Sequence, residues 1–224
     1  QPNLEAYKYM LRYNLLGSGF RNSLFVLIVG TSINLLMTMM TAYPLARRSL
    51  IGRKFFMLMI TFTMMFSGGL IPNYLVIVKL GLVDNLWSLI LPGCISAYNM
   101  IIMKNFFEAL PAELNEAARI DGSGEFHTFN YVVLPIMKPA LAVQAIFTFV
   151  ASWNNYFVPA LILTSNKKKT LPILIAQLRS ADFLKFDMGQ VYMLIAIAIM
   201  PVIIIYLFLS KFIVAGVALG GVKG

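Results

Sequence analysis

Charged residues, histidine and cysteine are all scarce in this sequence. Only 12% of its 224 residues are charged and 59% are hydrophobic, whereas about a quarter of the residues in a soluble domain carry charge. This composition excludes an ordinary soluble domain and predicts an integral membrane protein. The single cysteine, Cys94, excludes an internal disulfide and any paired-cysteine metal or redox site.

Groups that carry out catalysis are equally few. One histidine, His127, and carboxylates confined to loops leave little basis for an integral membrane enzyme, which needs convergent acids, bases or metal ligands. No stretch matches the phosphate-binding pattern GxxxxGK[ST], so we expect no enzyme activity, no metal and no ATP bound in that way. The formal net charge of +9 is attributed to Lys and Arg that flank apolar runs and meet membrane lipid, not to nucleic acid binding.

Five uncharged hydrophobic runs have the length of a bilayer span, about 20 helical residues. They cover residues 23–46, 55–78, 85–103, 139–166 and 188–210. Because these runs do not alternate, they predict helices, and we expect an all-α integral membrane fold in one domain over residues 1–224. A secondary carrier or channel is the alternative function. The absence of charge inside the runs and of an evident inverted repeat argues against it.

The orientation is not set by charge, because nine Lys and Arg fall on each side of the membrane when the connections alternate. The chain begins "QPNLEAYKYM", with neither an initiator Met nor a signal pattern. We expect a further segment to precede it in the full gene product.

Residues 104–138, here called the polar loop, separate the third and fourth runs. Pro111 suits the first position of a helix, and Gly122 suits a left-handed cap at its end. Ser123 is placed to cap a second helix, in which Phe126, Phe129 and Val133 share a face. The polar loop therefore predicts two short helices joined by a glycine turn, with Phe126 and Phe129 anchoring the second helix to the spans.

The polar loop is also acidic, with five carboxylates against three basic residues. The carboxylates are Glu108, Glu113, Glu116, Asp121 and Glu125. Helices that lie on anionic lipid favour Lys and Arg instead, so a protein partner fits this composition better. An amphipathic helix pair at the membrane surface, without a partner, is the alternative.

The stretch "EAARIDGSGEFHTFNYVVLPIMKP" resembles the EAA signature of ATP-binding-cassette (ABC) importer permeases, EAA–x3–G–x11–LP. Glu116-Ala117-Ala118, Gly122 and Leu134-Pro135 keep its spacing. "RNSLFV" at residues 21–26 resembles the entry to the core of such permeases, and the final "GVALGGVKG" resembles the end of maltose-type permeases. "FSGGLIPNYLVIVKLGLVDNLWSLILP" resembles the branch that imports larger oligosaccharides, including the alginate importer.

The resemblance implies a type I ABC importer permease fold in the bacterial cytoplasmic (inner) membrane. Such permeases have six core helices, of which this sequence shows five, the first being absent. The implied function is uptake of a carbohydrate, an oligosaccharide that is acidic if it is of the alginate type. The implied partners are a second permease subunit, two ATPase subunits that bind ATP and Mg²⁺, and an extracytoplasmic solute-binding protein.

The resemblance also implies roles for individual residues. The polar loop and the C-terminus would be cytoplasmic, and Glu116 would contact the ATPase. Ala117 and Ala118 would allow close approach, and Gly122 would form the turn. The remaining residues of the implied coupling site are Asp121, Ser123, Leu134 and Pro135, and those of a C-terminal tail directed to the ATPase are Gly220, Gly221 and Lys223.

Amide and aromatic side chains gather late in the fourth run, in "WNNYFVP". Amides can hydrogen-bond sugar hydroxyls and aromatic faces can stack on sugar rings, although helix packing explains such residues equally well. The candidate substrate path is Gln144, Trp153, Asn154, Asn155 and Tyr156. Residues 167–187 would be external, with "LPILIAQL" able to form a strand or a helix, and Lys167–Lys169 would favour an acidic sugar or docking face, or form a solvated rim.

Overall fold

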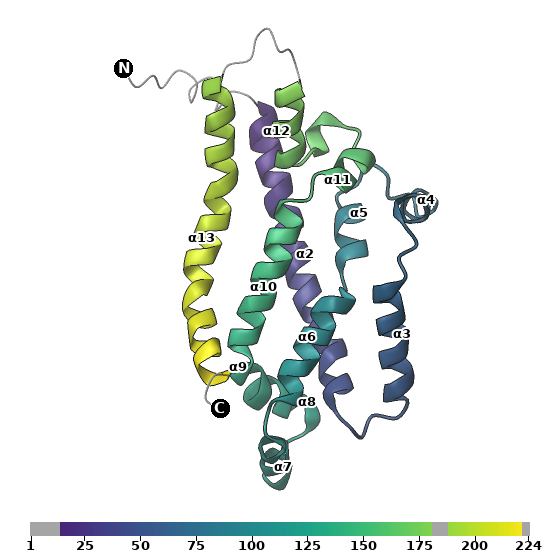
Figure 1. Ribbon diagram of the computed structural model, residues 1–224, viewed down its shortest axis with the longest axis vertical. Helices are drawn as coiled ribbons and strands as arrows, with labels where there is room; N and C mark the ends of the chain where they lie inside the picture. The colour runs from purple at the N-terminus through teal and green to yellow at the C-terminus, as the bar shows by residue number, and fades with distance from the viewer. Residues whose placement is uncertain (1–13, 181–187, 221–224) are drawn as a thin grey trace. The chain divides into compact units, whose positions relative to one another are not determined.

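The computed structural model describes residues 14–180 and 188–220, and within these ranges Figure 1 shows helices and no strands. The predicted all-α fold is therefore confirmed for the described residues. They divide into two compact units, each built from separate stretches of the chain. Unit 1 comprises residues 14–32, 68–94, 148–180 and 188–207, and unit 2 comprises residues 33–67, 95–147 and 208–220.

Three long helices contribute to both units: α2 (Asn14–Ala46), α10 (Lys138–Trp153) and α13 (Met188–Gly220). Unit 1 also contains α4 (Leu70–Lys79), α5 (Trp87–Ile90), the 3-10 helix η1 (Leu91–Gly93), α11 (Phe157–Ile162), the 3-10 helix η3 (Asn166–Lys168) and α12 (Leu171–Ser180). Unit 2 also contains α3 (Arg53–Met65), α6 (Ala97–Glu108), α7 (Ala112–Ile120), α8 (Glu125–His127), the π-helix η2 (Thr128–Val133) and α9 (Leu134–Ile136).

Several of the hydrophobic runs are interrupted helices. Among the described helices, one is long and apolar enough to cross a bilayer alone, Leu15–Ala46, and the number rises to three if each of two interrupted pairs counts as one span. Residues 55–78 are divided between α3 and α4, with Gly69 at φ +87° in the break. A backbone angle of this kind suits glycine, which explains why the apolar run does not continue as one helix.

The core of unit 2 is built where α2, α6 and α10 meet. Ala42, Met103 and Ala140 belong to its buried cluster. The ring of Tyr43 lies against those of Phe107 and Phe129, with centroid distances of 5.4 and 4.8 Å. This aromatic group fixes the end of α2 against the polar loop.

The core of unit 1 is centred on Trp153, which closes α10. Its indole stacks on Phe149 at 6.0 Å and meets Phe20 edge-on at 6.3 Å. The indole Nε1–H donates to the carbonyl of Ala198 at 2.9 Å, so the polar end of this buried ring is satisfied. Leu171, at the start of α12, completes the cluster.

Large apolar side chains remain exposed outside these cores. No residue of α3 is buried, and Leu58 and Met65 on it are exposed, as are Ile28 on α2 and Leu207 on α13. Apolar exposure on this scale is typical of surfaces that face lipid or another subunit.

Candidate coupling and transport sites

Helix α7 and its terminal turn match the sequence pattern closely. Pro111 precedes the helix as its N-cap residue, one position earlier than predicted. Gly122 has φ +76°, and its N–H donates to the carbonyl of Arg119 at 3.0 Å. The N–H of Ser123 donates to the carbonyl of Ala118 at 2.9 Å. These two bonds form a Schellman cap, so the predicted left-handed glycine turn is confirmed.

The second helix of the polar loop differs from the prediction. Gly124, and not Ser123, is the N-cap residue of α8, and the Ser123 hydroxyl instead accepts a hydrogen bond from Thr128 at 3.0 Å. Val133 is buried and Phe129 packs against the core, but Phe126 is 82% exposed. The anchoring role predicted for Phe126 is therefore wrong within this chain.

The π-helix η2 gives the physical reason. A π-helix bonds residue i to residue i+5, so residues five apart share a face. Thr128 and Val133 have this spacing, and both are buried. The predicted shared face of Phe126, Phe129 and Val133 was based on α-helical spacing. No signal in the sequence indicates the wider turn of a π-helix.

The signature residues on α7 divide between a packed and an open face. Ala118 is buried on the side of α7 that contacts η2, whereas Glu116, Ala117 and Asp121 are exposed. Glu116 forms no ion pair with any residue in the described part of the chain. Leu134 is half-buried and Pro135 exposed in α9.

Glu125, which the sequence shows only as one of five carboxylates in the polar loop, pairs with two arginines. One oxygen, Oε2, lies 2.5 Å from Arg47 and the other, Oε1, lies 2.6 Å from Arg119. The hydrogen bond from Arg47, followed by that from Arg119, lowers the pKa of Glu125 to about 2. Glu125 therefore joins the end of α7 to the residue that follows α2.

Arg47 is itself held by Tyr43. Its guanidinium donates to the Tyr43 hydroxyl and lies over that ring, 4.7 Å from the centroid. The Glu125 hydrogen bond raises the pKa of Arg47. The Tyr43 hydroxyl donates in turn to Asn115 Oδ1 on α7, a long contact of 3.4 Å. Tyr43, Arg47, Arg119 and Glu125 are called the Glu125 network below.

A second ion-pair group holds the connection between α2 and α3. Glu108 at the end of α6 pairs with Lys104, at 2.7 Å, and with Arg53. The Lys104 hydrogen bond lowers the pKa of Glu108, and Arg53 Nε–H also donates to the Leu45 carbonyl at 2.8 Å. A groove of about 750 Å³ lies beside these residues, and Arg48 and Glu116 line it.

The residues predicted to form a substrate path lie in more than one place. Trp153 ends α10, and Asn154, Asn155 and Tyr156 form the exposed break before α11. Asn154 and Tyr156 line a cavity of about 580 Å³ together with Trp153. Asn155 lines a different cavity of about 340 Å³, which contains Asn73 and Tyr74. The structure therefore places Asn154 and Tyr156 in one cavity and Asn155 in another, while Trp153 also lines a smaller cavity together with Asn155.

Gln144 belongs to unit 2 and lines neither cavity. Its side chain is 1% exposed, and both amide atoms lack a hydrogen-bond partner in the described part of the chain. The buried hydroxyl of Thr38 on α2 also lacks one. Unpaired buried amides are costly and uncommon in folded proteins, so Gln144 is exceptional among the predicted path residues.

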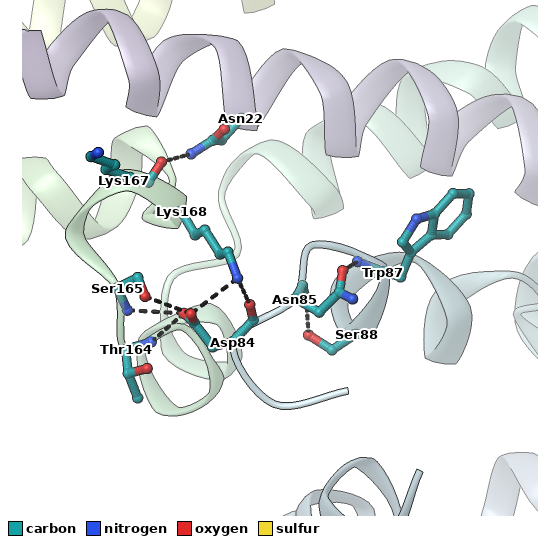
Figure 2. Close-up of polar contacts among 9 residues, drawn as sticks. All are labelled: Asn22, Asp84, Asn85, Trp87, Ser88, Thr164, Ser165, Lys167 and Lys168. Atoms are coloured by element: carbon teal, nitrogen blue, oxygen red, sulfur yellow. Dashed lines mark hydrogen bonds and ion pairs between the residues drawn. The ribbon is translucent and has the colours of Figure 1, made fainter. Parts of the chain in front are cut away.

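In unit 1, Asp84 occupies the turn between α4 and α5 with φ +56°. Figure 2 shows Thr164, Ser165 and Lys168 converging on it. The backbone N–H groups of Thr164 and Ser165 donate to Oδ1 at 3.0 and 2.9 Å, and the Ser165 hydroxyl donates to Oδ2 at 2.5 Å. The hydrogen bonds from Ser165, that of its hydroxyl first, and then Lys168 lower the pKa of Asp84. These four residues are called the Asp84 hub.

The segment after the Asp84 hub is held to α2 as well. The buried Asn22 amide donates to the carbonyls of Lys167 and Lys169 at 2.8 and 3.1 Å, and the Ser23 hydroxyl accepts from the Leu171 N–H at 2.8 Å. The residues "LPILIAQL" form the start of α12, which settles the choice between strand and helix. Figure 2 shows the bond from Asn22 to the Lys167 carbonyl.

Two further predictions concern metal binding and the C-terminus. Among the described residues, no group of three or more His, Cys, Asp and Glu side chains is placed to hold a metal ion. Gly220 is the last residue of α13, and Gly221 and Lys223 lie outside the described residues.

Comparisons with known proteins bear on the same elements. Residues 34–218 match the family described as "Binding-protein-dependent transport system inner membrane component". The chain belongs to this family. The match includes α7 with its glycine turn and the Glu125 network.

Similar proteins of known identity are permeases for carbohydrates. The polygalacturonan/rhamnogalacturonan transport system permease protein YtcP of Bacillus subtilis (strain 168) is 37% identical, over 99% of this chain and 82% of the relative. The arabinooligosaccharides transport system permease protein AraQ of Halalkalibacterium halodurans is 35% identical, over 92% of this chain and 74% of the relative.

A solved structure shares the fold. It is a bacterial ABC transporter involved in the import of the acidic polysaccharide alginate, and one of its chains is 31% identical with a TM-score of 0.82, covering 92% of this chain and 78% of that chain. The fold is therefore that of an ABC importer permease, and the protein is an inner-membrane component of a binding-protein-dependent transport system. The predicted family and fold class are confirmed.

Proposed function

We propose that this chain is a permease subunit of an ATP-driven importer that takes up an oligosaccharide delivered by an extracytoplasmic binding protein. The observation that carries the proposal is its 37% identity, over almost its whole length, to a permease for polygalacturonan and rhamnogalacturonan. Polygalacturonan is an acidic polymer, as is the alginate of the structural relative. An acidic oligosaccharide is therefore the substrate class that we test first.

Coupling to ATP hydrolysis is assigned to α7. The sequence has no phosphate-binding loop of its own, so a separate ATPase subunit supplies the energy. Glu116 supports this assignment because it is exposed, unpaired among the described residues, and lines the groove of about 750 Å³. In this proposal Glu116 contacts the ATPase, Ala117 permits close approach, and the polar loop and C-terminal residues 220, 221 and 223 face the cytoplasm.

The remaining subunits follow from the same mechanism. One permease chain forms only part of a transmembrane path, so a second permease subunit completes it and each permease docks on one of two ATPases. No residue of α3 is buried within this chain, which is consistent with a further subunit or lipid covering the surface of α3.

Substrate contact is assigned to the break between α10 and α11. Asn154 and Tyr156 line the cavity of about 580 Å³ beside the Trp153 indole, and an amide with two aromatic rings suits the hydroxyls and apolar face of a sugar. In the second cavity Asn155 is joined by Asn73 and Tyr74, a set of the same chemistry. Gln144 contributes, in this proposal, an amide whose partner is the substrate or a water that travels with it.

The test uses the assembled transporter in proteoliposomes with its binding protein. We expect ATP hydrolysis and sugar uptake to rise together with an acidic oligosaccharide, more than with a neutral oligosaccharide of equal length. Glu116→Ala should abolish the stimulated ATPase activity, whereas Glu113→Ala, a neighbouring exposed carboxylate on the same helix, should preserve it. Uptake that continues without ATPase subunits and follows the proton gradient would instead establish a secondary carrier.

A further inference from the structure

Glu125 is not part of the signature pattern, yet it is the acid through which α7 is attached to the rest of unit 2. The distal end of α7 provides Arg119, and the chain just beyond α2 provides Arg47. Each arginine contacts a different oxygen of the same carboxylate, at 2.6 and 2.5 Å. A single side chain thus bridges two elements that are distant in sequence.

The α2 side of this bridge is rigid. Arg47 is 28% exposed and is fixed by both the hydroxyl and the ring of Tyr43. Tyr43 lies against Phe107 and Phe129 in the core cluster, and position 42 beside it is fully buried. Arg47 therefore transmits a displacement to the core instead of swinging freely.

The α7 side offers little other attachment. Of its residues only Ala118 is buried, and the contact between Tyr43 and Asn115 is long, at 3.4 Å. Apart from these contacts, α7 is attached only by its chain connections, the short link from α6 at one end and the capped glycine turn at the other. Without the ionic bridge, α7 would be able to move while α2 stayed in place.

We propose that Glu125 is a positioning residue that locks α7 to the end of α2 through Arg47 and Arg119, so that a displacement of α7 also displaces α2. The inference rests on the proposed function, because it assumes that α7 receives its displacement from an ATPase. It adds a residue outside the signature, and a specific route, to that function.

The functional test is a double-mutant cycle on the assembled transporter. Glu125→Gln and Arg47→Gln remove charge without changing size greatly, and each should lower the ratio of stimulated to basal ATPase activity about fivefold, the lower end of coupling energies between sites. The double variant should lose no more than either single variant, because both changes break the same bridge. Basal activity, which needs only the ATPase, should persist.

Matched controls keep the interpretation specific. Glu113→Gln changes an exposed carboxylate of α7, and Lys54→Gln changes an exposed basic residue at the start of α3. Neither residue forms an ion pair with another residue in the described ranges. Both controls should keep the wild-type ratio. Single variants that keep the wild-type ratio, or losses that multiply in the double variant, would overturn the proposal.

A second measurement does not depend on substrate. Spin labels at Ile51→Cys and Ile120→Cys, both exposed positions of unit 2, report the distance between the α2–α3 connection and α7, in a Cys94→Ser background. We expect one narrow distance distribution with and without ATP in the wild type, and a broad one in Arg47→Gln. A broad distribution in the wild type, or a narrow one in Arg47→Gln, would contradict the lock.

The two proposals fail in different ways. A wild-type complex that no oligosaccharide and binding protein stimulate would refute the proposed function, while the label distances would still report on the lock. A stimulated wild type in which Glu125→Gln behaves normally would leave the function intact and refute the role of Glu125.

Discussion

Asp84 and Glu125 each collect several hydrogen-bond donors, but the donors differ in kind. Three of the four donors at Asp84 are neutral, two backbone N–H groups and a hydroxyl, and Lys168 is the fourth. Within the described part of the chain, Glu125 is bound by two arginines alone. The Asp84 side chain is 21% exposed, and that of Glu125 is 55% exposed.

The two carboxylates therefore act differently: Asp84 is an anchor held by backbone groups, and Glu125 is a bridge that links two elements through side chains. Backbone N–H groups cannot leave Asp84 unless residues 164 and 165 change conformation, so the Asp84 hub fixes a loop. Guanidinium groups on side chains can stay on a carboxylate while the elements that carry them shift together, although each surface ion pair is worth only ~1 kcal/mol or less. The Glu125 network therefore suits a part that moves, and the Asp84 hub suits a part that does not.

The largest effect is expected from removing the anchor. Asp84→Ala leaves three neutral donors without an acceptor and places a less tolerant residue at φ +56°. We expect the Tm of the purified complex to fall by about 5 °C. Asp121→Ala, which alters an exposed carboxylate with no ion pair in the described ranges, should leave the Tm unchanged. An equal fall in both variants would show that Asp84 is not an anchor.

The second effect concerns the turn that positions Glu125. Gly122→Ala adds a Cβ that meets no atom within 4 Å but must adopt φ +76°, which costs about 1 kcal/mol or more. Gly124→Ala adds a Cβ in equally open space at φ −71°. We therefore expect thermal unfolding to shift by about 2–4 °C for Gly122→Ala only. Identical shifts would mean that space, and not backbone angle, limits this turn.

A third effect is a difference in salt dependence between the Glu125 network and the Asp84 hub. Raising salt from about 0.15 M to about 1 M shortens the screening length from ~8 to ~3 Å. The difference between wild type and Glu125→Gln in ATPase stimulation should shrink, while the Tm difference between wild type and Asp84→Ala should hardly change. If the effect of Glu125→Gln were as insensitive to salt as that of Asp84→Ala, the ion pairs of Glu125 would not be exposed to screening as proposed.

The smallest effect is expected from pH. The two arginines lower the pKa of Glu125 from 4.5 to about 2, so its stabilising contribution is complete above about pH 4.5 and is lost as the pH falls through 2. The difference in Tm between wild type and Glu125→Gln should thus stay constant between about pH 8 and about pH 5. A difference that declined over this range would show that the arginines do not hold the carboxylate in solution.

Much of the polar loop was predictable because its signals are local. Pro111, the strong helix formers after it and Gly122 predict α7 and its turn, and the structure has both. The location of Gly122 needs no distant contact, because a left-handed cap is decided by the residue itself. By contrast, the predicted anchoring role of Phe126 is wrong: Phe126 is exposed in α8, just before the π-helix η2, which no signal in the sequence indicates.

The sequence by itself determined the membrane class, the helical fold and the helix–glycine–helix order of the polar loop, since hydropathy, helix capping and glycine conformation act over a few residues. Only the tertiary structure decided which polar side chains bond to one another. Asp84 and Ser165 are 81 residues apart, and Tyr43 and Asn115 are 72 apart. Each of these polar side chains has many equivalent partners along the chain, so the pairing is decided by the packing of apolar helices that brings one partner within reach.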